Sequence, residues 1–442
     1  MIDGWNSMSA SALGREIGAG RVDPVALTEA FLDAIDQHKH RDLIFARSTA
    51  ERALSEAEAA RQRCKDGVRR GVLDGVPISW KDLYDTAGTI TEAGSALLKG
   101  RVPDQDAAVL QNATSAGLVC LGKTHMTELA FSGLGLNPVT ATPPNVNDPA
   151  LAPGGSSSGA ATSVAFGLAA AGIGSDTGGS VRIPAAWNNL VGLKTTSGLL
   201  SLEGVVPLCA KFDTVGPLCH TVEDAAHLLA AMGGSKAPDL ENASLSGLRF
   251  AVLETVALDH CRPAPMAAFD GALASLAAKG AQISRLSFAG IQRAMDLAGC
   301  LYVVEAWAQW GKEIEADPDK MYGPVRQRFE AGKNYSGFEY VRAWKELKRI
   351  RAEYEALTAG YDAVLIPSSS VLPPDRERLL SDNDYFISEN LLALNNTRIG
   401  NLMGVCALTL PTDTAGAGIM AMASPYAEQR LLRIGAAMEA AL

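Results

Sequence analysis

Histidine is scarce in this chain and is missing from its later part. The 442 residues include six histidines, and none follows His260. The nucleophile elbow of α/β-hydrolases, Gly-x-Ser-x-Gly, depends on a histidine that comes late in the chain, after the acidic residue. The stretch Gly155-Ser-Ser-Ser-Gly159 fits the elbow pattern, but the missing histidine argues against a histidine-dependent serine hydrolase.

The histidines and cysteines also lack the spacing of a metal site. His38 and His40 fall at a polar helix end, where solvated basic side chains are favoured by the helix dipole. The seven cysteines are odd in number and form no Cys-x-x-Cys pair. Several lie in apolar segments, which is typical of reduced core thiols in a cytoplasmic protein. We therefore expect a cytoplasmic location, no metal and no organic cofactor.

Positive charge, targeting sequences and linkers are lacking as well. The net charge is −10 at pH 7, which argues against a nucleic-acid-binding surface. The opening residues Met1-Ile-Asp-Gly-Trp5 lack the basic and apolar runs of a secretion signal. No linker or internal repeat divides the chain, so we expect one large domain that spans residues 1–442.

An uncharged stretch at 153–175 has the length of a membrane span. Its content of Gly, Ser and Ala favours a buried helix and a strand instead. The helix is expected over about 160–170, and the strand over about 173–176. No membrane association is therefore expected.

The stretch Gly117-Leu-Val-Cys-Leu-Gly-Lys-Thr124 matches the phosphate-binding pattern G-x-x-x-x-G-K-[ST] letter for letter. A phosphate loop is an open turn between a strand and a helix. Here the middle residues Leu, Val, Cys and Leu predict the strand itself, and an amphipathic helix over 107–116 precedes them. The stretch therefore predicts a buried strand, and nucleotide binding is not expected.

What the chain does contain is an alternation of strand and helix patterns that is typical of an α/β fold. Helical patterns fill residues 8–63, and strands alternate with helices from about 75 to 255. Residues 288–358 turn helical and charged, which is typical of solvated helix faces. Later apolar runs at 361–367 and 406–411 predict two more buried strands.

Lys81 ends a short apolar run, Gly75-Val-Pro-Ile-Ser-Trp80, which predicts a buried strand. Burial disfavours a charged amine and lowers its pKa, and a neutral lysine can serve as the base for a serine hydroxyl. Most lysines instead extend along the surface with the ammonium group in water. Taken alone, Lys81 would be interpreted as such a surface lysine.

Two serine-bearing stretches make the lysine part of a pattern. Pro153-Gly-Gly-Ser-Ser-Ser-Gly159 has the composition of a flexible linker, but it runs straight into the predicted buried helix. Thr177-Gly-Gly-Ser180 predicts a tight turn that opens a helix with Pro184 in its first turn. Ser180 would then lie beside unpaired backbone N–H groups, a setting suited to a nucleophile with an oxyanion hole. A serine-capped turn without a catalytic role is the alternative for this stretch alone.

In these blocks the chain resembles the amidase signature family. The order and spacing of Lys81, Ser156 and Ser180 fit that family, and the resemblance is strongest over about residues 65–230. Further blocks that match are 74–86, 121–133, 191–204, 213–217 and 221–225. The resemblance implies one α/β domain with a mixed central β-sheet flanked by helices. It implies a helical N-terminal segment (8–63), a catalytic core (65–230) and a helical cover over the pocket (288–400).

The resemblance also implies a role for each matching residue. Ser180 matches the nucleophile, Ser156 matches a bridging serine that follows a cis peptide bond, and Lys81 matches the general base that acts through this bridge. The implied oxyanion-hole residues are Thr177, Gly178, Gly179 and Ser180. The implied supporting residues are Ser157, Asp176 and Arg182, and the implied pocket-lining residues are Ala130, Phe131 and Ser132.

The 288–400 region offers further candidates for a substrate pocket. The guanidinium of Arg398 is suited to hold a substrate carboxylate; a structural ion pair is the alternative. A carboxylate would favour small acidic amides such as malonamate, or urea-type compounds such as biuret and allophanate. Six aromatic residues of this region either line an aromatic pocket or pack in the core: Tyr302, Trp307, Trp310, Tyr322, Tyr335 and Phe338.

The activity implied by the resemblance is hydrolysis of a small-molecule carboxamide C–N bond through an acyl-enzyme, with release of ammonia or an amine. The alternative is the A subunit of an amidotransferase, which generates ammonia from glutamine for a partner that modifies tRNA. A third alternative is a scaffold that has kept only the fold, and the intact Lys81, Ser156 and Ser180 argue against it. We favour a free-standing hydrolase with no direct nucleic-acid contact, and a homodimer stays open.

Overall fold

The computed structural model describes residues 4–234 and 236–442, and the described chain is organised around one long β-sheet. The strands are β1 Phe45–Ser48, β2 Pro77–Lys81, β3 Val119–Thr124, β4 Gly172–Ser175, β5 Val191–Lys194, β6 Val215–Cys219, β7 Arg249–Glu254, β8 Gln282–Ser287, β9 Ala363–Pro367, β10 Cys406–Pro411 and β11 Gly418–Ala423. Their order across the sheet is β1-β3-β2-β4-β6-β5-β10-β11-β9-β7-β8.

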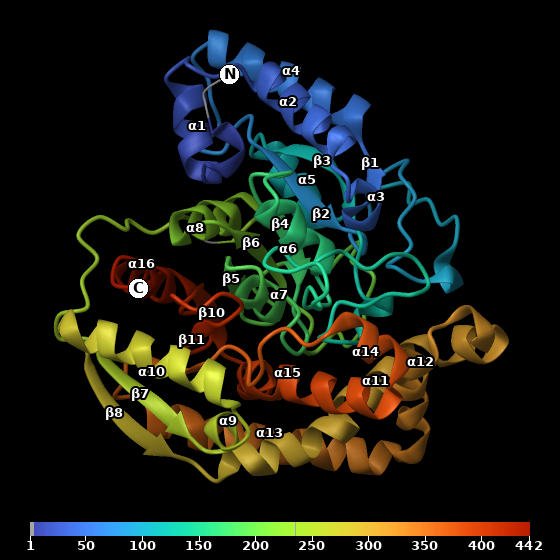
Figure 1. Cartoon of the computed structure of the whole chain (residues 1–442), viewed down its shortest axis with the longest axis vertical. Coiled ribbons are helices and arrows are strands. Elements are labelled where there is room, and N and C mark those ends of the chain that lie inside the picture. The colour runs from blue at the N-terminus through green and yellow to red at the C-terminus, as the bar shows by residue number, and fades with distance from the viewer. Residues whose placement is uncertain (1–3, 235) are drawn as a thin grey trace.

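Helices surround this sheet (Figure 1). They are α1 Ala10–Gly18, α2 Pro24–Gln37, α3 Arg41–Ile44, α4 Ala50–Lys65, α5 Ala108–Ser115, α6 Ser158–Ala165, α7 Arg182–Trp187, α8 Val222–Ala231, α9 Val256–Asp259, α10 Pro263–Ala278, α11 Gly290–Ala316, α12 Gly323–Glu330, α13 Gly337–Thr358, α14 Arg376–Ser381, α15 Asn383–Met403 and α16 Glu428–Glu439. Helices α1, α2 and α4 gather at the β1–β3 end of the sheet, whereas α11, α12 and α13 gather at the opposite end of the molecule.

The sheet is mixed, as the resemblance to the amidase signature family implies. Strand β2 pairs in parallel with β3 and β4, and β7 pairs in parallel with β8 and β9. The run β4-β6-β5-β10-β11-β9 between these two groups is antiparallel. Strands β2, β3 and β4 are buried along their whole length, because helices and loops cover both faces, and this explains their continuous apolar or small-residue sequences.

The phosphate-loop pattern lies in β3, as predicted. Residues Val119–Thr124 form a fully buried strand, and α5 precedes it. Lys123 is buried with it, and its Nζ donates to the carbonyl oxygen of Tyr84 at 2.6 Å and to Thr91 Oγ1 at 2.8 Å. These hydrogen bonds give Lys123 a structural role. Because the pattern forms a strand, it provides no open turn that could bind a phosphate.

Two predicted elements need correction. The buried helix expected over 160–170 ends at Ala165, because Gly167 adopts φ +68° and turns the chain toward β4. The N-terminal segment 8–63, expected to be helical throughout, contains strand β1, which pairs antiparallel with β3 at the edge of the sheet. Both deviations are short, and periodicity alone does not resolve elements of four or five residues.

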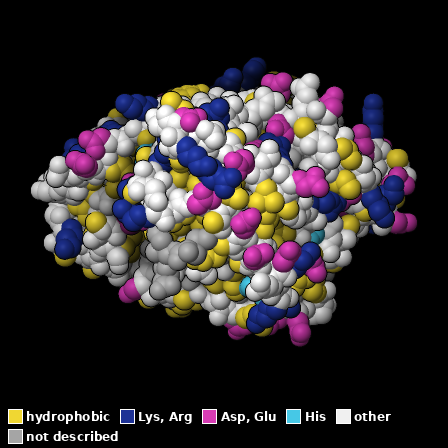
Figure 2. All heavy atoms as spheres, turned by 90° about the horizontal axis from the view of Figure 1, so that it is seen from above, with side chains coloured by type: hydrophobic (Ala, Val, Ile, Leu, Met, Phe, Trp, Pro, Cys, Tyr) yellow, Lys and Arg dark blue, Asp and Glu magenta, His cyan; other side chains and the backbone are white. Residues whose placement is uncertain are grey.

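Charges of both signs are interspersed on the face above the N-terminal helices. Figure 2 shows Lys and Arg side chains alternating with Asp and Glu side chains there, without a large basic patch. Within the described part of the chain, no helix combines the length and the apolar composition needed to span a bilayer.

Candidate active site

Lys81 is the last residue of β2, and its side chain is fully buried. The Nζ atom lies 2.8 Å from Ser156 Oγ and 2.8 Å from Ser175 Oγ. Burial lowers the pKa of Lys81 to about 7, although the nearby carboxylates of Asp176 and Asp213 act in the opposite direction. A substantial fraction of this amine is therefore neutral near pH 7. Ser175, the second partner, was missed by sequence reasoning.

The loop before α6 brings Ser156 to this lysine. The Gly155–Ser156 peptide bond is cis, which is the conformation that the resemblance implies. Gly155 cannot carry a side chain, because a Cβ atom would lie 2.6 Å from the backbone nitrogen of Gly135. The neighbouring Ser157 Oγ donates to the carbonyl oxygen of Ser175 and accepts from its N–H, both at 3.2 Å. Ser157 thus joins this loop to the end of β4.

Ser180 lies in the turn between β4 and α7. The backbone N–H of Ser157 donates to the carbonyl oxygen of Ser180 at 3.2 Å, so the two serine stretches are in direct contact. Among the described residues, the Ser180 hydroxyl forms no hydrogen bond within the protein, and Ser180 lines a cavity. Gly179 adopts φ +142°, and a Cβ atom there would lie 2.1 Å from Thr397 Oγ1. Only glycine fits this position.

Three of the four backbone N–H groups expected to form an oxyanion hole are free among the described residues. The N–H groups of Thr177, Gly178 and Ser180 have no acceptor among the residues that the structure describes. The Gly179 N–H instead donates to Asp176 Oδ1 at 2.9 Å. The expectation that Gly179 contributes a free N–H is therefore corrected: its amide holds the turn in shape.

Asp176 and Arg182 brace the turn from behind. Both are fully buried, and Arg182 donates through Nη2 to Asp176 Oδ1 at 2.8 Å and through Nε to Oδ2 at 3.0 Å. Asp176 also accepts from the backbone N–H of Val181 at 3.1 Å and from Asn401 Nδ2 at 2.9 Å. Burial alone would raise the pKa of Asp176, but the Arg182 guanidinium outweighs burial and holds the pKa well below its usual range.

Asp213 fixes the other side of the turn and was not predicted as a site residue. Its Oδ1 accepts from Thr177 Oγ1 at 2.5 Å, and its Oδ2 accepts from the N–H groups of Leu208 and Cys209, both at 3.0 Å. Burial raises the pKa of Asp213. The sequence signal was present, since Asp213 opens one of the blocks that match the family, but its partner lies on a different segment.

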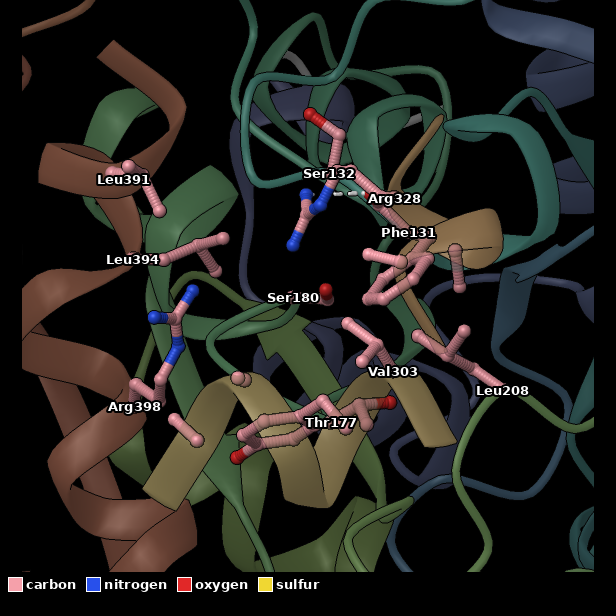
Figure 3. A pocket seen from close by; sticks show the side chains of 16 residues that line it. Phe131, Ser132, Thr177, Ser180, Leu208, Val303, Arg328, Leu391, Leu394 and Arg398 are labelled. Atoms are coloured by element: carbon pink, nitrogen blue, oxygen red, sulfur yellow. Dashed lines mark hydrogen bonds between the residues drawn. The ribbon is translucent and has the colours of Figure 1, made fainter. Parts of the chain in front are cut away.

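A cavity of about 200 Å³ opens in front of Ser180. The expected pocket residues Ala130, Phe131, Ser132 and Arg398 all line it, together with Thr177, Gly178 and Ser180 (Figure 3). The cover contributes Tyr302 and Val303 from α11, Arg328 from α12, and Leu391, Leu394 and Arg398 from α15. Arg328 was missed because no motif surrounds it.

Of the six aromatic candidates, Tyr302 lines this cavity. Phe131, predicted from the other side, also lines it. Trp310 is core, because its indole N–H donates to the carbonyl oxygen of Pro207 at 2.8 Å. Phe338 is 70% exposed on α13 and so points to solvent. Trp307, Tyr322 and Tyr335 also lie outside the lining residues.

Within the described residues, Arg398 takes part in no ion pair. No carboxylate of a described residue lies within salt-bridge distance of Arg398 or of Arg328, which contradicts the structural alternative. As for metals, the described residues form no cluster of three or more His, Cys, Asp or Glu side chains suited to hold an ion.

A mixed sheet that buries a lysine behind a glycine-rich serine turn is the architecture of a hydrolase acting on amide C–N bonds. Comparison with known proteins agrees. A family model described as Amidase matches residues 26–432. The chain belongs to this family, the amidase signature family, and is an amidohydrolase of that kind.

Two relatives and one solved structure illustrate which proteins this chain is similar to. The chain is 35% identical to a 2-amino-5-chloromuconic acid deaminase of Comamonas testosteroni, over 98% of this chain and 97% of that one. It is 41% identical to the A subunit of glutamyl-tRNA(Gln) amidotransferase from Anaeromyxobacter dehalogenans, over 52% of this chain and 48% of the relative. The peptide amidase of Stenotrophomonas maltophilia superposes with a TM-score of 0.83 at 26% identity, over 98% and 96% of the two chains.

Proposed function

We propose that the chain hydrolyses a small-molecule carboxamide through a Ser180–Ser156–Lys81 relay and an acyl-enzyme, releasing ammonia or an amine. The observation that carries the proposal is the buried contact of Lys81 Nζ with Ser156 Oγ, at 2.8 Å, directly behind the Ser180 turn. A base with a pKa of about 7 is matched to proton transfer at neutral pH.

The proposed cycle uses only groups of this chain and water. Neutral Lys81 takes the proton of Ser156, which takes the proton of Ser180, and the Ser180 oxygen attacks the amide carbonyl carbon. The N–H groups of Thr177, Gly178 and Ser180 bind the oxyanion of the tetrahedral intermediate. The proton returns through Ser156 to the leaving nitrogen as the C–N bond breaks. Water then cleaves the acyl-enzyme by the same relay with the roles of acid and base exchanged.

A second candidate is hydrolytic deamination of an amino-substituted acid. It is favoured by the similarity to the 2-amino-5-chloromuconic acid deaminase, which matches along almost its whole length. Both candidates release ammonia, but an amino-substituted carbon carries no carbonyl oxygen for the N–H groups of the Ser180 turn to bind. The geometry of the turn therefore favours the carboxamide.

The amidotransferase alternative has weaker support. The similarity at 41% identity spans about half of this chain and half of the Anaeromyxobacter relative. Along 98% of this chain, the identity is 29% to the corresponding protein of Thermobifida fusca, against 35% to the deaminase. Similarity over the whole chain, which includes the cover of the cavity, thus favours the small-molecule enzyme.

The test is ammonia release by the purified chain over a panel of compounds. The panel holds malonamate, biuret, allophanate, indoleacetamide, asparagine, glutamine and 2-amino-5-chloromuconate, and an aryl anilide followed by its released arylamine. Each compound is also run with Ser180→Ala. Turnover of one amide that is lost in the variant supports the proposal; turnover that persists in the variant contradicts it, and hydrolysis of glutamine alone would favour the amidotransferase.

A further inference from the structure

Two guanidinium groups enter the cavity in front of Ser180 from different helices of the cover. Arg328 comes from α12 and Arg398 from α15, and Figure 3 shows both side chains pointing into the space around the Ser180 hydroxyl. The lining residues include no Asp or Glu. The cavity therefore carries two positive charges that nothing in the described protein neutralises.

Each guanidinium is held in place without an acid. Arg328 Nη1 donates to the carbonyl oxygen of Phe131 at 2.7 Å, and its guanidinium carbon lies 4.3 Å from the centre of the Phe131 ring. Arg398 lies over Tyr302, with its guanidinium carbon 5.9 Å from the ring centre. Contacts of this kind orient a guanidinium and leave most of its N–H donors free.

The surroundings of the two guanidinium groups disfavour their positive charge. Burial, and then the neighbouring Arg398 charge, lower the pKa of Arg328 to about 9. Burial also lowers the pKa of Arg398. Both arginines are half-buried. A planar guanidinium is the side chain best suited to bind a carboxylate through two parallel hydrogen bonds.

The volume and walls of the cavity restrict the ligand further. The cavity, about 200 Å³, has room for a small molecule. The remaining walls are largely apolar, with Val303, Leu394 and Phe131 facing the cavity. A short carbon chain fits such a space, whereas a positively charged substituent would meet two guanidinium groups and no acid.

We propose that the substrate is a monoamide of a short dicarboxylic acid, whose free carboxylate binds Arg328 and Arg398 while its carboxamide faces Ser180. The same site discriminates against glutamine, because its α-ammonium group finds no acid in the cavity. This inference rests on the proposed amidase function and adds the charge of the substrate to it.

The test uses three matched compounds of equal chain length: glutaramate, pentanamide and glutamine. Pentanamide replaces the carboxylate by a methyl group, and glutamine adds an α-ammonium group. Malonamate and succinamate extend the series to shorter chains. We expect kcat/KM for the best monoamide acid to exceed that of its uncharged counterpart by roughly 10- to 100-fold, the range for hydrogen bonds to a charged group. Glutamine should fall below glutaramate.

Variants assign this preference to the two arginines. Arg328→Gln and Arg398→Gln should each reduce the ratio of kcat/KM between the acid and the uncharged amide by roughly tenfold or more. Arg349→Gln, an exposed arginine on α13, is the matched control and should leave the ratio unchanged. Arg328→Lys and Arg398→Lys keep the charge, and circular dichroism confirms that each variant is folded.

The outcomes separate this inference from the amidase proposal. If wild type hydrolyses pentanamide as efficiently as the acids, and Ser180→Ala abolishes both, the amidase function stands and the carboxylate site is wrong. If no compound is hydrolysed, binding of malonate, succinate and glutarate to Ser180→Ala is measured by calorimetry. Binding that weakens at least tenfold in Ser180→Ala/Arg398→Gln supports the site, and the absence of binding overturns it.

Discussion

The turn at residues 176–182, which carries Ser180, and the helical cover of the cavity differ in how their charged side chains are paired. In the turn, the carboxylate of Asp176 is paired with Arg182 and receives backbone N–H groups as well. In the cover, Arg328 and Arg398 face the same cavity without a carboxylate from the described protein. The two regions meet at Ser180, within one cavity.

This difference matches two different tasks: holding the reacting groups in place and choosing the substrate. A reacting group must be held in one geometry, and a fully paired, buried network around the turn does this. A selecting group must keep its binding capacity for the ligand, so it is oriented by aromatic and carbonyl contacts and left without its ionic partner. Changes in the turn should therefore affect catalysis or stability for every substrate, whereas changes in the cover should affect the choice among substrates.

The largest effect is expected from Ser180→Ala. Loss of the nucleophilic oxygen should reduce kcat by about 10⁴- to 10⁶-fold, the scale seen when a catalytic nucleophile is removed. The side chain shrinks by one atom and forms no hydrogen bond within the described protein, so the thermal midpoint should stay within a few degrees of wild type. Steady-state kinetics and a melting curve on the same preparation check both halves, and full activity in the variant would refute the assignment.

Removal of the base should come next. Lys81→Met should reduce kcat/KM by roughly 10²- to 10⁴-fold, the usual contribution of a general base. The folded-state pKa of Lys81, about 7, is below its ordinary value, so folding disfavours the proton that the unfolded chain binds at neutral pH. Methionine removes that cost, and the variant should unfold at the same temperature as wild type or higher. A large loss of stability would show that the amine is structural.

The pH dependence of wild type tests the same amine without a mutation. Only neutral Lys81 can accept the Ser156 proton, so kcat/KM should fall as the pH is lowered through about 7, and should approach a tenfold loss per pH unit below it. Between pH 7 and 10 the fraction of neutral amine is high, and the profile should reach a plateau. Rates that stay constant from pH 5 to 8 would contradict this role of Lys81.

Asp176→Asn probes the paired side of the comparison. The change leaves the buried Arg182 guanidinium without its charge partner, and breaking a buried pair costs about 3–5 kcal/mol in the free energy of unfolding. The turn should also lose order, because Asp176 accepts the Gly179 and Val181 N–H groups. Denaturant unfolding measures the first effect, and a loss below about 1 kcal/mol would show that the network is not needed.

The smallest expected effect on stability is at Ser132, where the pocket wall contacts helix α15 of the cover. Ser132 Oγ donates to Asn390 Oδ1 of α15 at 3.0 Å and accepts from the N–H of Leu134 at 3.2 Å, and Ser132→Ala removes both hydrogen bonds. Stability should fall by about 2 kcal/mol, because each of the two lost hydrogen bonds has a usual net value of about 1 kcal/mol. The Gly133 N–H keeps its hydrogen bond to the same Asn390 oxygen at 2.9 Å. A much larger loss of stability would mean that the contact between the pocket wall and α15 depends mainly on the Ser132 hydroxyl.

The residues of the Ser180 turn can be predicted from the sequence far more clearly than the residues that the cover contributes to the cavity. Short motifs with glycines and apolar neighbours contain Lys81, Ser156 and Ser180. These motifs follow one another along the chain in the order that the family resemblance implies. Arg328 stands in an ordinary amphipathic helix, and whether its side chain reaches Ser180 depends on how α12 packs against α11. The sequence does not encode that packing in any local pattern.

The same limit explains the aromatic residues and the edge strand. Tyr302 and Trp310 lie on the same helix, α11, yet one faces the cavity and the other faces Pro207. Strand β1 is four residues long and lies between two helices, so its hydrophobic pattern is too short to indicate a strand. The Gly179 amide was expected to be free because the turn was considered without the side chain of Asp176, which folds back to accept it.

The most direct test of the central claim is covalent labelling with a fluorophosphonate, which reacts with activated serine hydroxyls and needs no knowledge of the substrate. Peptide mapping by mass spectrometry locates the adduct, and the labelling rate is followed from pH 5 to 9 in wild type and Lys81→Met. The account predicts a single adduct on Ser180, a rate that rises through pH 7, and slow labelling of the variant. An adduct on Ser156, or a rate unchanged by Lys81→Met, would contradict the Ser180–Ser156–Lys81 relay.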